Sequence, residues 1–208
     1  MTHLSCDLAN KLTQLNDSEV QASIITHALT SCSLGYVCYG KVRHRAFWLA
    51  CTLLGILPDA DVIGFRFGVK YEDILGHRGF FHSLLFCAIV GCIAMLCYRR
   101  YVERKKSPFV LWFFFACAMA THPLLDACTT GGLGVAFFSP FDTTRYFFAH
   151  QVIKVSPIGV GEFFSWHGVQ ILLSEFKWVW LPCMVAVGVA WVVRLRLTRK
   201  WVCGAYYA

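Results

Sequence analysis

Residues 79–98 have the sequence GFFHSLLFCAIVGCIAMLCY, a run of twenty residues without Asp, Glu, Lys or Arg. A helix needs about 20 mainly apolar residues to cross a hydrocarbon core about 30 Å thick. This run therefore predicts a transmembrane helix. Trp178–Leu195 is a second clear candidate, and weaker ones lie at about 22–40, 46–65 and 109–127.

The composition of the whole chain agrees with a membrane protein. Of 208 residues, 57% are hydrophobic and 15% charged, and the mean hydropathy is +0.56. A soluble domain is about 45–50% apolar and about 25% charged. The composition excludes a disordered tail, a collagen-like fibre and a typical cytosolic enzyme. We expect an all-α polytopic helical bundle with four or five transmembrane helices, forming a single membrane domain over residues 1–208.

Two parts of the chain are not expected to cross the membrane. Residues 1–21 form a polar N-terminal tail. Residues 128–177 are rich in aromatic residues and interrupted by Gly and Pro, so we expect an interfacial or re-entrant segment on the outer side.

Basic residues gather in three segments between or after the candidate spans. With five spans these segments all lie on one side, which the positive-inside rule makes the cytoplasm, together with the C-terminus. The positive charge is thus a topology signal, and no nucleic-acid partner is expected. The basic residues concerned are Lys41, Arg43, Arg45, Arg99, Arg100, Arg104, Lys105, Lys106, Arg194, Arg196, Arg199 and Lys200.

Histidines and aspartates occur in or beside four of the spans. An ionisable group at the bilayer centre costs at least about 2.5–3.5 kcal/mol, so such groups need partners. In the five-span topology all of them lie toward the outer side, where a divalent cation would neutralise the carboxylates. The residues are His27, Asp59, Asp61, His77, His82, His122 and Asp126.

The spacing of these residues supports convergence on a metal ion. His122 and Asp126 are four residues apart and share one helix face, although Pro123 between them is a potential kink. His77 and His82 are five apart, and Gly79 between them favours His77 on an entering loop and His82 on the first turn. Imidazole with carboxylate favours zinc, with manganese or another divalent metal as the alternative.

Each of these residues also has a simpler interpretation. His27 alone could form a hydrogen bond to a neighbouring helix, and Asp59 or Asp61 could cap a turn after Pro58. Arg78 and Arg145 are candidates for binding a phosphate through their guanidinium groups, or else cations whose side chains extend to the membrane surface.

Four motifs in order resemble a known family. They are LPDAD (57–61), HRGFFHSL (77–84), HPLLDACTTGG (122–132) and FSPFD (138–142), and Thr26 with His27 fits the start of the same pattern. The chain resembles the YdjM family of LexA-regulated, inner-membrane-associated, metal-dependent hydrolases of bacteria over roughly residues 22–150. The resemblance implies a multi-pass protein of the bacterial inner membrane with hydrolase activity.

The residues and the resemblance together predict a membrane-embedded metal-dependent hydrolase. We expect a lipid-linked or phosphate-containing envelope substrate and a metal-activated water. The predicted ligands are His27, Asp61, His82, His122 and Asp126, with His77 and Asp59 as catalytic groups and Arg78 and Arg145 binding substrate. The alternatives are an ion- or metal-coupled transporter, in which the same groups form a pathway, and a non-catalytic membrane interaction protein.

Overall fold

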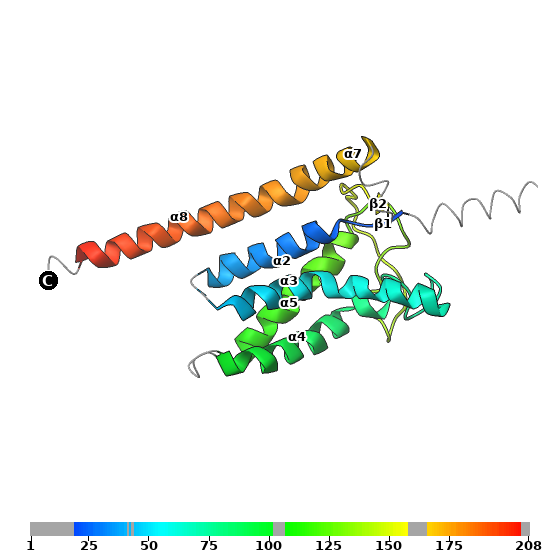
Figure 1. Cartoon of the computed structure of the whole chain (residues 1–208), viewed down its shortest axis with the longest axis horizontal. Helices are drawn as coiled ribbons and strands as arrows, with labels where there is room; N and C mark the ends of the chain where they lie inside the picture. The colour runs from blue at the N-terminus through cyan, green and yellow to red at the C-terminus, as the bar shows by residue number, and fades with distance from the viewer. Residues whose placement is uncertain (1–18, 41, 43, 102–106, 158–165, 205–208) are drawn as a thin grey trace, which may run out of the picture.

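The computed structural model describes residues 19–40, 42, 44–101, 107–157 and 166–204, so most of the predicted N-terminal tail lies outside the described residues. In this part of the chain five helices form a bundle and run alternately up and down (Figure 1). They are α2 (Ile24–Tyr39), α3 (Arg45–Ile56), α4 (Leu84–Tyr98), α5 (Pro108–Asp126) and α8 (Leu181–Gly204).

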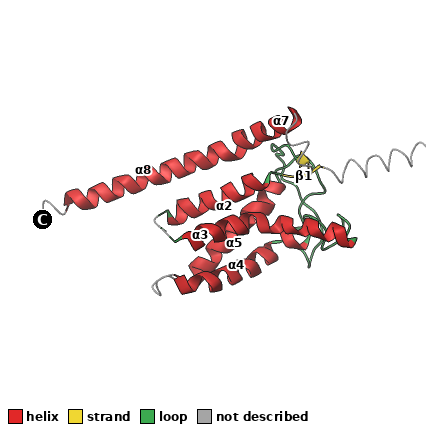
Figure 2. Ribbon diagram, viewed as in Figure 1, coloured by secondary structure: helices red, strands yellow, loops and turns green. Residues whose placement is uncertain are grey.

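Shorter elements extend or link these helices (Figure 2). A 3-10 segment continues α3, and α7 joins α8 through a π-helical turn, so the last helix is long and nearly continuous. The short elements are β1 (Glu19–Gln21), η1 (Leu57–Phe67), η2 (Phe80–His82), η3 (Arg99–Tyr101), β2 (Ser156–Pro157), α7 (Trp166–Glu175) and η4 (Phe176–Trp180).

The expectation of an all-helical bundle with four or five membrane helices is confirmed. Four helical stretches are long and apolar enough to span a bilayer: Arg45–Phe67, Leu84–Tyr101, Pro108–Asp126 and Gly168–Leu197. The fifth helix, α2, has 16 residues and is therefore about 24 Å long, somewhat short of the hydrocarbon core. The only strands among the described residues are β1 and β2, which pair antiparallel.

Local sequence explains where the helices begin. Ser23 and Ser83 are extended residues whose hydroxyls accept hydrogen bonds from the backbone N–H of Thr26 and Phe86. Because Ser83 caps α4, that helix starts at Leu84 and not at Gly79, where the apolar run begins. Pro108 starts α5 at a position where its missing N–H costs nothing.

The core lies between α3, α4 and α5 and is largely aromatic. Phe47 stacks on Phe114 with ring centroids 5.5 Å apart, and Phe115 and Met119 are fully buried beside them. A Cβ atom on Gly91 of α4 would lie 2.6 Å from the backbone nitrogen of Ala116, so α4 and α5 approach at a distance only glycine permits. Small residues at helix contacts are typical of membrane bundles.

The helix from Trp166 to Gly204 packs on α2 and otherwise presents apolar side chains outward. Val185, Val189 and Trp191 are all more than half exposed, which suits contact with lipid chains. Of the predicted non-spanning segment 128–177, the last twelve residues are helical or π-helical, and the candidate span Gly168–Leu197 already includes most of them.

The two ends of the bundle differ in chemistry. At one end, here called the basic end, α3 begins at Arg45, α4 is followed by Arg99 and Arg100, and Arg194 contacts the last turn of α2. At the other, the site end, α3 passes into η1, α4 and α2 begin, α5 ends, and the segment 128–157 folds over them (Figure 1). The helices therefore gather the predicted histidines and aspartates at one end.

Candidate metal centre

The site end of the bundle contains one buried cluster of histidine and aspartate side chains. His27 comes from α2, Asp59 and Asp61 from η1, His82 from η2, and His122 and Asp126 from α5, while His77 lies on the loop before η2. The five side chains at positions 27, 77, 82, 122 and 126 are fully buried, and the two aspartates of η1 are each 6% exposed. The predicted convergence of four segments is confirmed.

Four of these residues point ligand atoms at one another. Nε2 of His82 lies 3.1 Å from Nε2 of His122 and 3.2 Å from Oδ2 of Asp126. Nε2 of His122 lies 3.1 Å from Oδ1 of Asp59 and 3.4 Å from Oδ2 of Asp126. The four donor atoms all lie within 4.8 Å of one another, so this group could hold a metal ion.

A second group lies on the other side of the His82 ring. Oδ1 of Asp61 is hydrogen-bonded to Nδ1 of His77 at 2.7 Å, and its Oδ2 lies 3.1 Å from Nδ1 of His82. These three residues also satisfy the distance requirement for a metal site. His82 belongs to both groups, one through each ring nitrogen.

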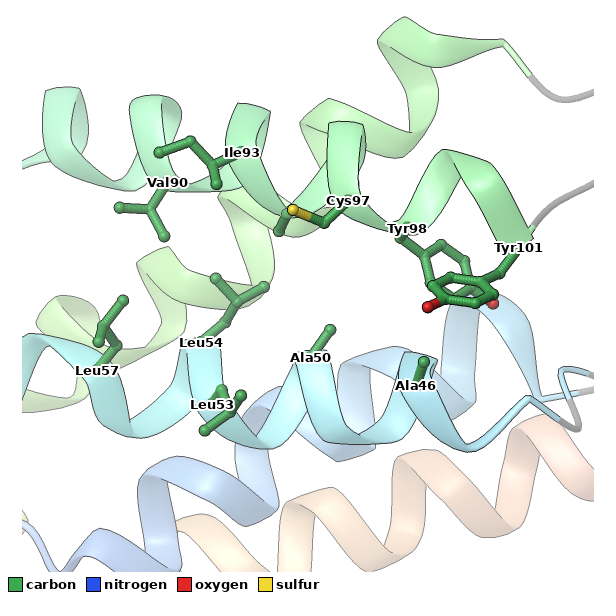
Figure 3. Close-up of a pocket in the computed structure, with 11 residues that line it drawn as sticks. Ala46, Ala50, Leu53, Leu54, Leu57, Val90, Ile93, Cys97, Tyr98 and Tyr101 are labelled. Atoms are coloured by element: carbon green, nitrogen blue, oxygen red, sulfur yellow. The ribbon is translucent and has the colours of Figure 1, made fainter.

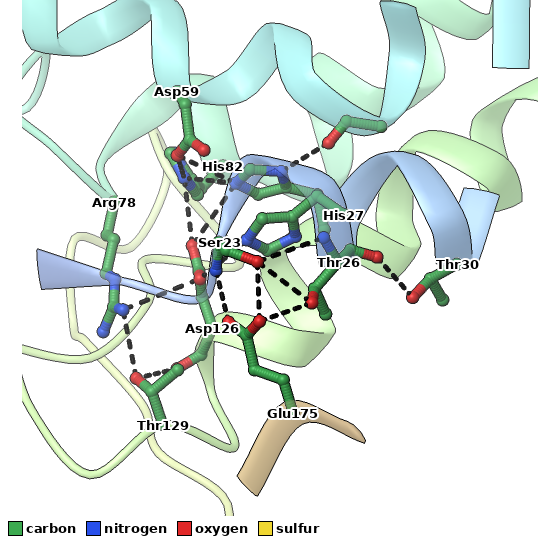
Figure 4. Close-up of polar contacts among 12 residues, drawn as sticks. Ser23, Thr26, His27, Thr30, Asp59, Arg78, His82, Asp126, Thr129 and Glu175 are labelled. Atoms are coloured by element: carbon green, nitrogen blue, oxygen red, sulfur yellow. Dashed lines mark hydrogen bonds and ion pairs between the residues drawn. The ribbon is translucent and has the colours of Figure 1, made fainter. Parts of the chain in front are cut away.

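His27 and Arg78 complete the surroundings of Asp126. The His27 ring stacks on His122 with centroids 3.6 Å apart, and its Nε2 lies 3.5 Å from Oδ1 of Asp126. Arg78 approaches the same oxygen at 3.6 Å and donates to the Thr129 hydroxyl at 3.0 Å (Figure 4). His27, a predicted metal ligand, and Arg78, predicted to bind substrate, thus both approach the carboxylate of Asp126.

Backbone geometry explains how the chain brings these groups together. Pro58 lies in the first turn of the 3-10 segment η1, which turns Asp59 and Asp61 toward the bundle. Arg78 adopts φ 60°, a left-handed conformation that non-glycine residues rarely adopt, and it separates His77 from η2. Backbone of this kind is held in place by its surroundings and is common at functional sites.

Arg145 lies outside the cluster and holds the His77 loop from behind. Its guanidinium donates to the backbone oxygens of His77 and Tyr71, each at 2.9 Å. Burial lowers the pKa of Arg145 and raises the pKa of Tyr71, whose ring packs edge-on against His77 at 5.4 Å. The predicted contact of Arg145 with substrate stays a prediction. Its observed contacts hold the loop that carries His77.

Several buried polar atoms of the cluster lack hydrogen-bond partners and could instead be ligands of a cation. Neither oxygen of Asp126 has a hydrogen-bond partner, and both ring nitrogens of His27 also lack one. Buried polar groups in proteins are nearly always satisfied, and unsatisfied ones require an explanation such as an ion. The mixed nitrogen and oxygen donor set is one that zinc and related divalent metals accept.

Glu175 was not among the residues predicted for the site. This fully buried carboxylate accepts hydrogen bonds from the backbone and hydroxyl of Ser23 and from the hydroxyl of Thr26, next to His27 (Figure 4). An acidic residue between apolar stretches, as in LLSEFKWVW at 172–180, was a usable signal, because such a residue requires a partner.

Comparison with known proteins places these motifs in a family. Residues 23–199 match the family described as YdjM inner membrane protein. The chain belongs to the YdjM family. It is similar to the inner membrane protein YbcI of Escherichia coli (strain K12), with 38% identity over 169 residues, covering 81% of this chain and 96% of that protein. No solved structure gives a significant match.

Membership of the family confirms two expectations from the sequence. The chain is an inner membrane protein with several membrane helices, as the composition and the motifs indicated. The matched region also extends to residue 199, beyond the part in which motifs were identified, and so includes Glu175 and the last span.

Proposed function

We propose that this YdjM-family protein is a metal-dependent hydrolase that acts on a lipid-linked, phosphate-containing substrate at the membrane surface. The observation that carries the proposal is the group formed by Asp59, His82, His122 and Asp126, four buried donor atoms within 4.8 Å of one another. Ionisable groups are rarely placed at the end of membrane helices in this number without a function.

The ring orientations of two histidines favour this group as the metal site. His122 donates its Nδ1 proton to the carbonyl oxygen of Gly55, which leaves the Nε2 lone pair facing the cluster. Nδ1 of His82 faces Asp61, so its Nε2 is likewise the atom available as a ligand. A carboxylate behind a ligating histidine is a common arrangement in metal sites, and it gives Asp61 an orienting role.

A divalent cation bound here, zinc by preference, would lower the pKa of a bound water and polarise a phosphoryl oxygen. The protein's own groups would then orient the reaction. Arg78 holds one oxygen of Asp126 through its contact at 3.6 Å. Nε2 of His77 is buried without a hydrogen-bond partner, so it is an atom at which a proton can be accepted and returned.

The position of the cluster supports a lipid-linked substrate. Asp126 is the last residue of one span, and His82 precedes the first residue of another by two positions. Residues at helix ends lie near the membrane surface, where lipid headgroups lie. A phosphate-bearing headgroup could therefore reach this depth without leaving the bilayer.

Metal content of the detergent-purified protein tests the proposal. Elemental mass spectrometry should find a near-stoichiometric divalent metal in the wild type and its loss in His82→Ala and Asp126→Asn. His150→Ala and Asp142→Asn are matched controls, because neither side chain belongs to the cluster; His150 is exposed and Asp142 is half-buried. Hydrogen bonds from Thr144 hold the pKa of Asp142 below its usual value, so this control also removes a carboxylate charge.

The second step is turnover on lipid phosphates in detergent or vesicles. The wild type should release headgroup or phosphate, and Asp126→Asn should be folded but inactive. A folded wild type that stays metal-free after incubation with zinc and manganese would refute the metal site. Metal binding without hydrolysis, but with flux of ions across vesicles, would instead favour a transporter.

A further inference from the structure

An apolar groove runs between α3 and α4, and none of its lining residues belongs to the histidine and aspartate cluster (Figure 3). Its volume is about 260 Å³. On α3, the small side chains of Ala46 and Ala50 create the space near the basic end, and leucines form the wall toward the site end. The lining residues are Ala46, Ala50, Leu53, Leu54, Leu57, Val90, Ile93, Ala94, Cys97, Tyr98 and Tyr101.

The groove opens from two helices that both qualify as membrane spans. Arg45–Phe67 and Leu84–Tyr101 form its walls, and none of the lining residues is charged. In the part of the chain that the structure describes, no other helix lines it. Its surroundings in a bilayer are therefore acyl chains.

The two ends of the groove are different. Tyr98 and Tyr101 lie at the end near Ala46, whereas Leu57 and Val90 lie toward the other end (Figure 3). Tyrosine places its ring in apolar surroundings and its hydroxyl at the polar surface, as in the aromatic belts of membrane proteins. The tyrosine end is thus the membrane surface of the groove.

Three exposed arginines stand at that same end. Arg45 begins α3, and Arg99 and Arg100 directly follow α4 between the two lining tyrosines. None of the three forms an ion pair within the described ranges of the chain. Guanidinium groups match phosphate oxygens, and basic clusters beside a membrane helix attract anionic lipids.

The dimensions of the groove suit a single acyl chain. Ala46 and Leu57 are eleven residues apart on one helix, which is about 16 Å and close to half of a hydrocarbon core about 30 Å thick. The volume is a little below the range of about 300–1,000 Å³ typical of pockets for drug-sized ligands.

We propose that the groove between α3 and α4 binds one acyl chain of an anionic phospholipid from the leaflet at the basic end. The phosphate of this lipid pairs with Arg45, Arg99 and Arg100, and the terminal methyl group points toward Leu57 and Val90. The site is separate from the metal centre and does not depend on hydrolysis.

Photo-crosslinking in nanodiscs tests this proposal. The protein is placed in phosphatidylcholine discs containing phosphatidylglycerol with a diazirine at the end of one chain, and labelled peptides are mapped. We expect labelling around Leu57 and Val90, competed by unlabelled phosphatidylglycerol but not by extra phosphatidylcholine. Ala50→Phe or Ala94→Phe should abolish it, whereas Ala186→Phe on the exposed face of α8 should not.

The charge contribution is tested with Arg99→Gln together with Arg100→Gln, which should remove the preference for the anionic lipid. Arg196→Gln, an exposed arginine of α8, is the control. Labelling near Ala46 would mean a lipid from the opposite leaflet and would overturn the proposal. Equal labelling by a phosphatidylcholine probe, no labelling in the groove, or a dimer crosslinked through α3 and α4 would also overturn it.

Discussion

The imidazole of His122 donates its Nδ1 proton to the carbonyl oxygen of Gly55, at 2.7 Å, and so turns its Nε2 into the cluster. Gly55 belongs to α3, and a Cβ atom there would lie 2.6 Å from the carbonyl oxygen of His27 on α2. One glycine therefore allows α2 and α3 to meet and orients a histidine of α5. Helix packing and the geometry of the candidate metal centre are therefore coupled at this position.

Gly55→Ala should reduce both stability and metal content. The added methyl group meets the backbone of α2, and overpacking of this kind costs about 1–3 kcal/mol. It also displaces the carbonyl that orients His122, so a lower thermal midpoint in detergent should accompany a lower metal stoichiometry. Gly188→Ala is the matched control, because nothing lies within 4 Å of the corresponding position on α8. Equal behaviour of the two variants would contradict the coupling.

Asp61→Asn should weaken metal binding without abolishing it. Oδ1 of Asp61 is hydrogen-bonded to Nδ1 of His77, and its Oδ2 faces Nδ1 of His82. An asparagine has one oxygen in place of these two, so its NH2 group would face one of the rings. Loss of such an orienting partner typically weakens metal affinity 10- to 100-fold. Titration with zinc should therefore restore occupancy in Asp61→Asn but not in Asp126→Asn. If neither variant, or both, can be refilled, the two aspartates do not have the different roles assigned here.

Much of the fold followed from the sequence because membrane helices are strongly constrained. An apolar run such as 79–98 forms an α-helix in a bilayer, because a helix satisfies the backbone N–H and C=O groups within the segment. Counting the spans then predicted that the histidines and aspartates lie at the same end of the bundle. The start of α4 at Leu84 was missed because the cap at Ser83 is a local feature within an apolar run.

The relations within the site could not be predicted in the same way. That His82 presents one nitrogen to Asp126 and the other to Asp61 depends on the turn at Arg78, whose left-handed conformation no sequence pattern indicated. The role of Glu175 depends on a contact with residues about 150 positions earlier. Long-range contacts of this kind come from helix packing, which periodicity does not encode.

The orientation of the protein in the membrane is a further prediction. The basic end should face the cytoplasm, because loops rich in Lys and Arg are retained there. A green fluorescent protein fused to the C-terminus should fluoresce, and alkaline phosphatase inserted after the exposed residue Thr143 should be active. The reverse pattern would put the metal centre on the cytoplasmic side and exclude an envelope-facing substrate.

The long helix Trp166–Gly204 contacts both ends of α2, through an acidic residue at one end and a basic residue at the other. Glu175 accepts hydrogen bonds at the N-terminus of α2, and Arg194 donates to the carbonyl oxygens of Tyr36 and Val37 near its C-terminus. Both charges complement the helix dipole, which is positive at the N-terminus and negative at the C-terminus. Because α2 carries His27, this arrangement also fixes one wall of the metal centre.

Glu175→Ala should therefore destabilise the protein and loosen the metal centre together. Hydrogen bonds to charged groups contribute about 1.5–3 kcal/mol each, and the carboxylate accepts from both Ser23 and Thr26. We expect a clear fall in thermal midpoint, a smaller fall in Glu175→Gln, whose amide nitrogen cannot accept, and none in the exposed control Glu72→Gln. The metal-loaded protein should lose metal to a chelator faster in Glu175→Ala than in the wild type. Unchanged melting and unchanged metal release would mean that α2 and His27 are held by the bundle alone.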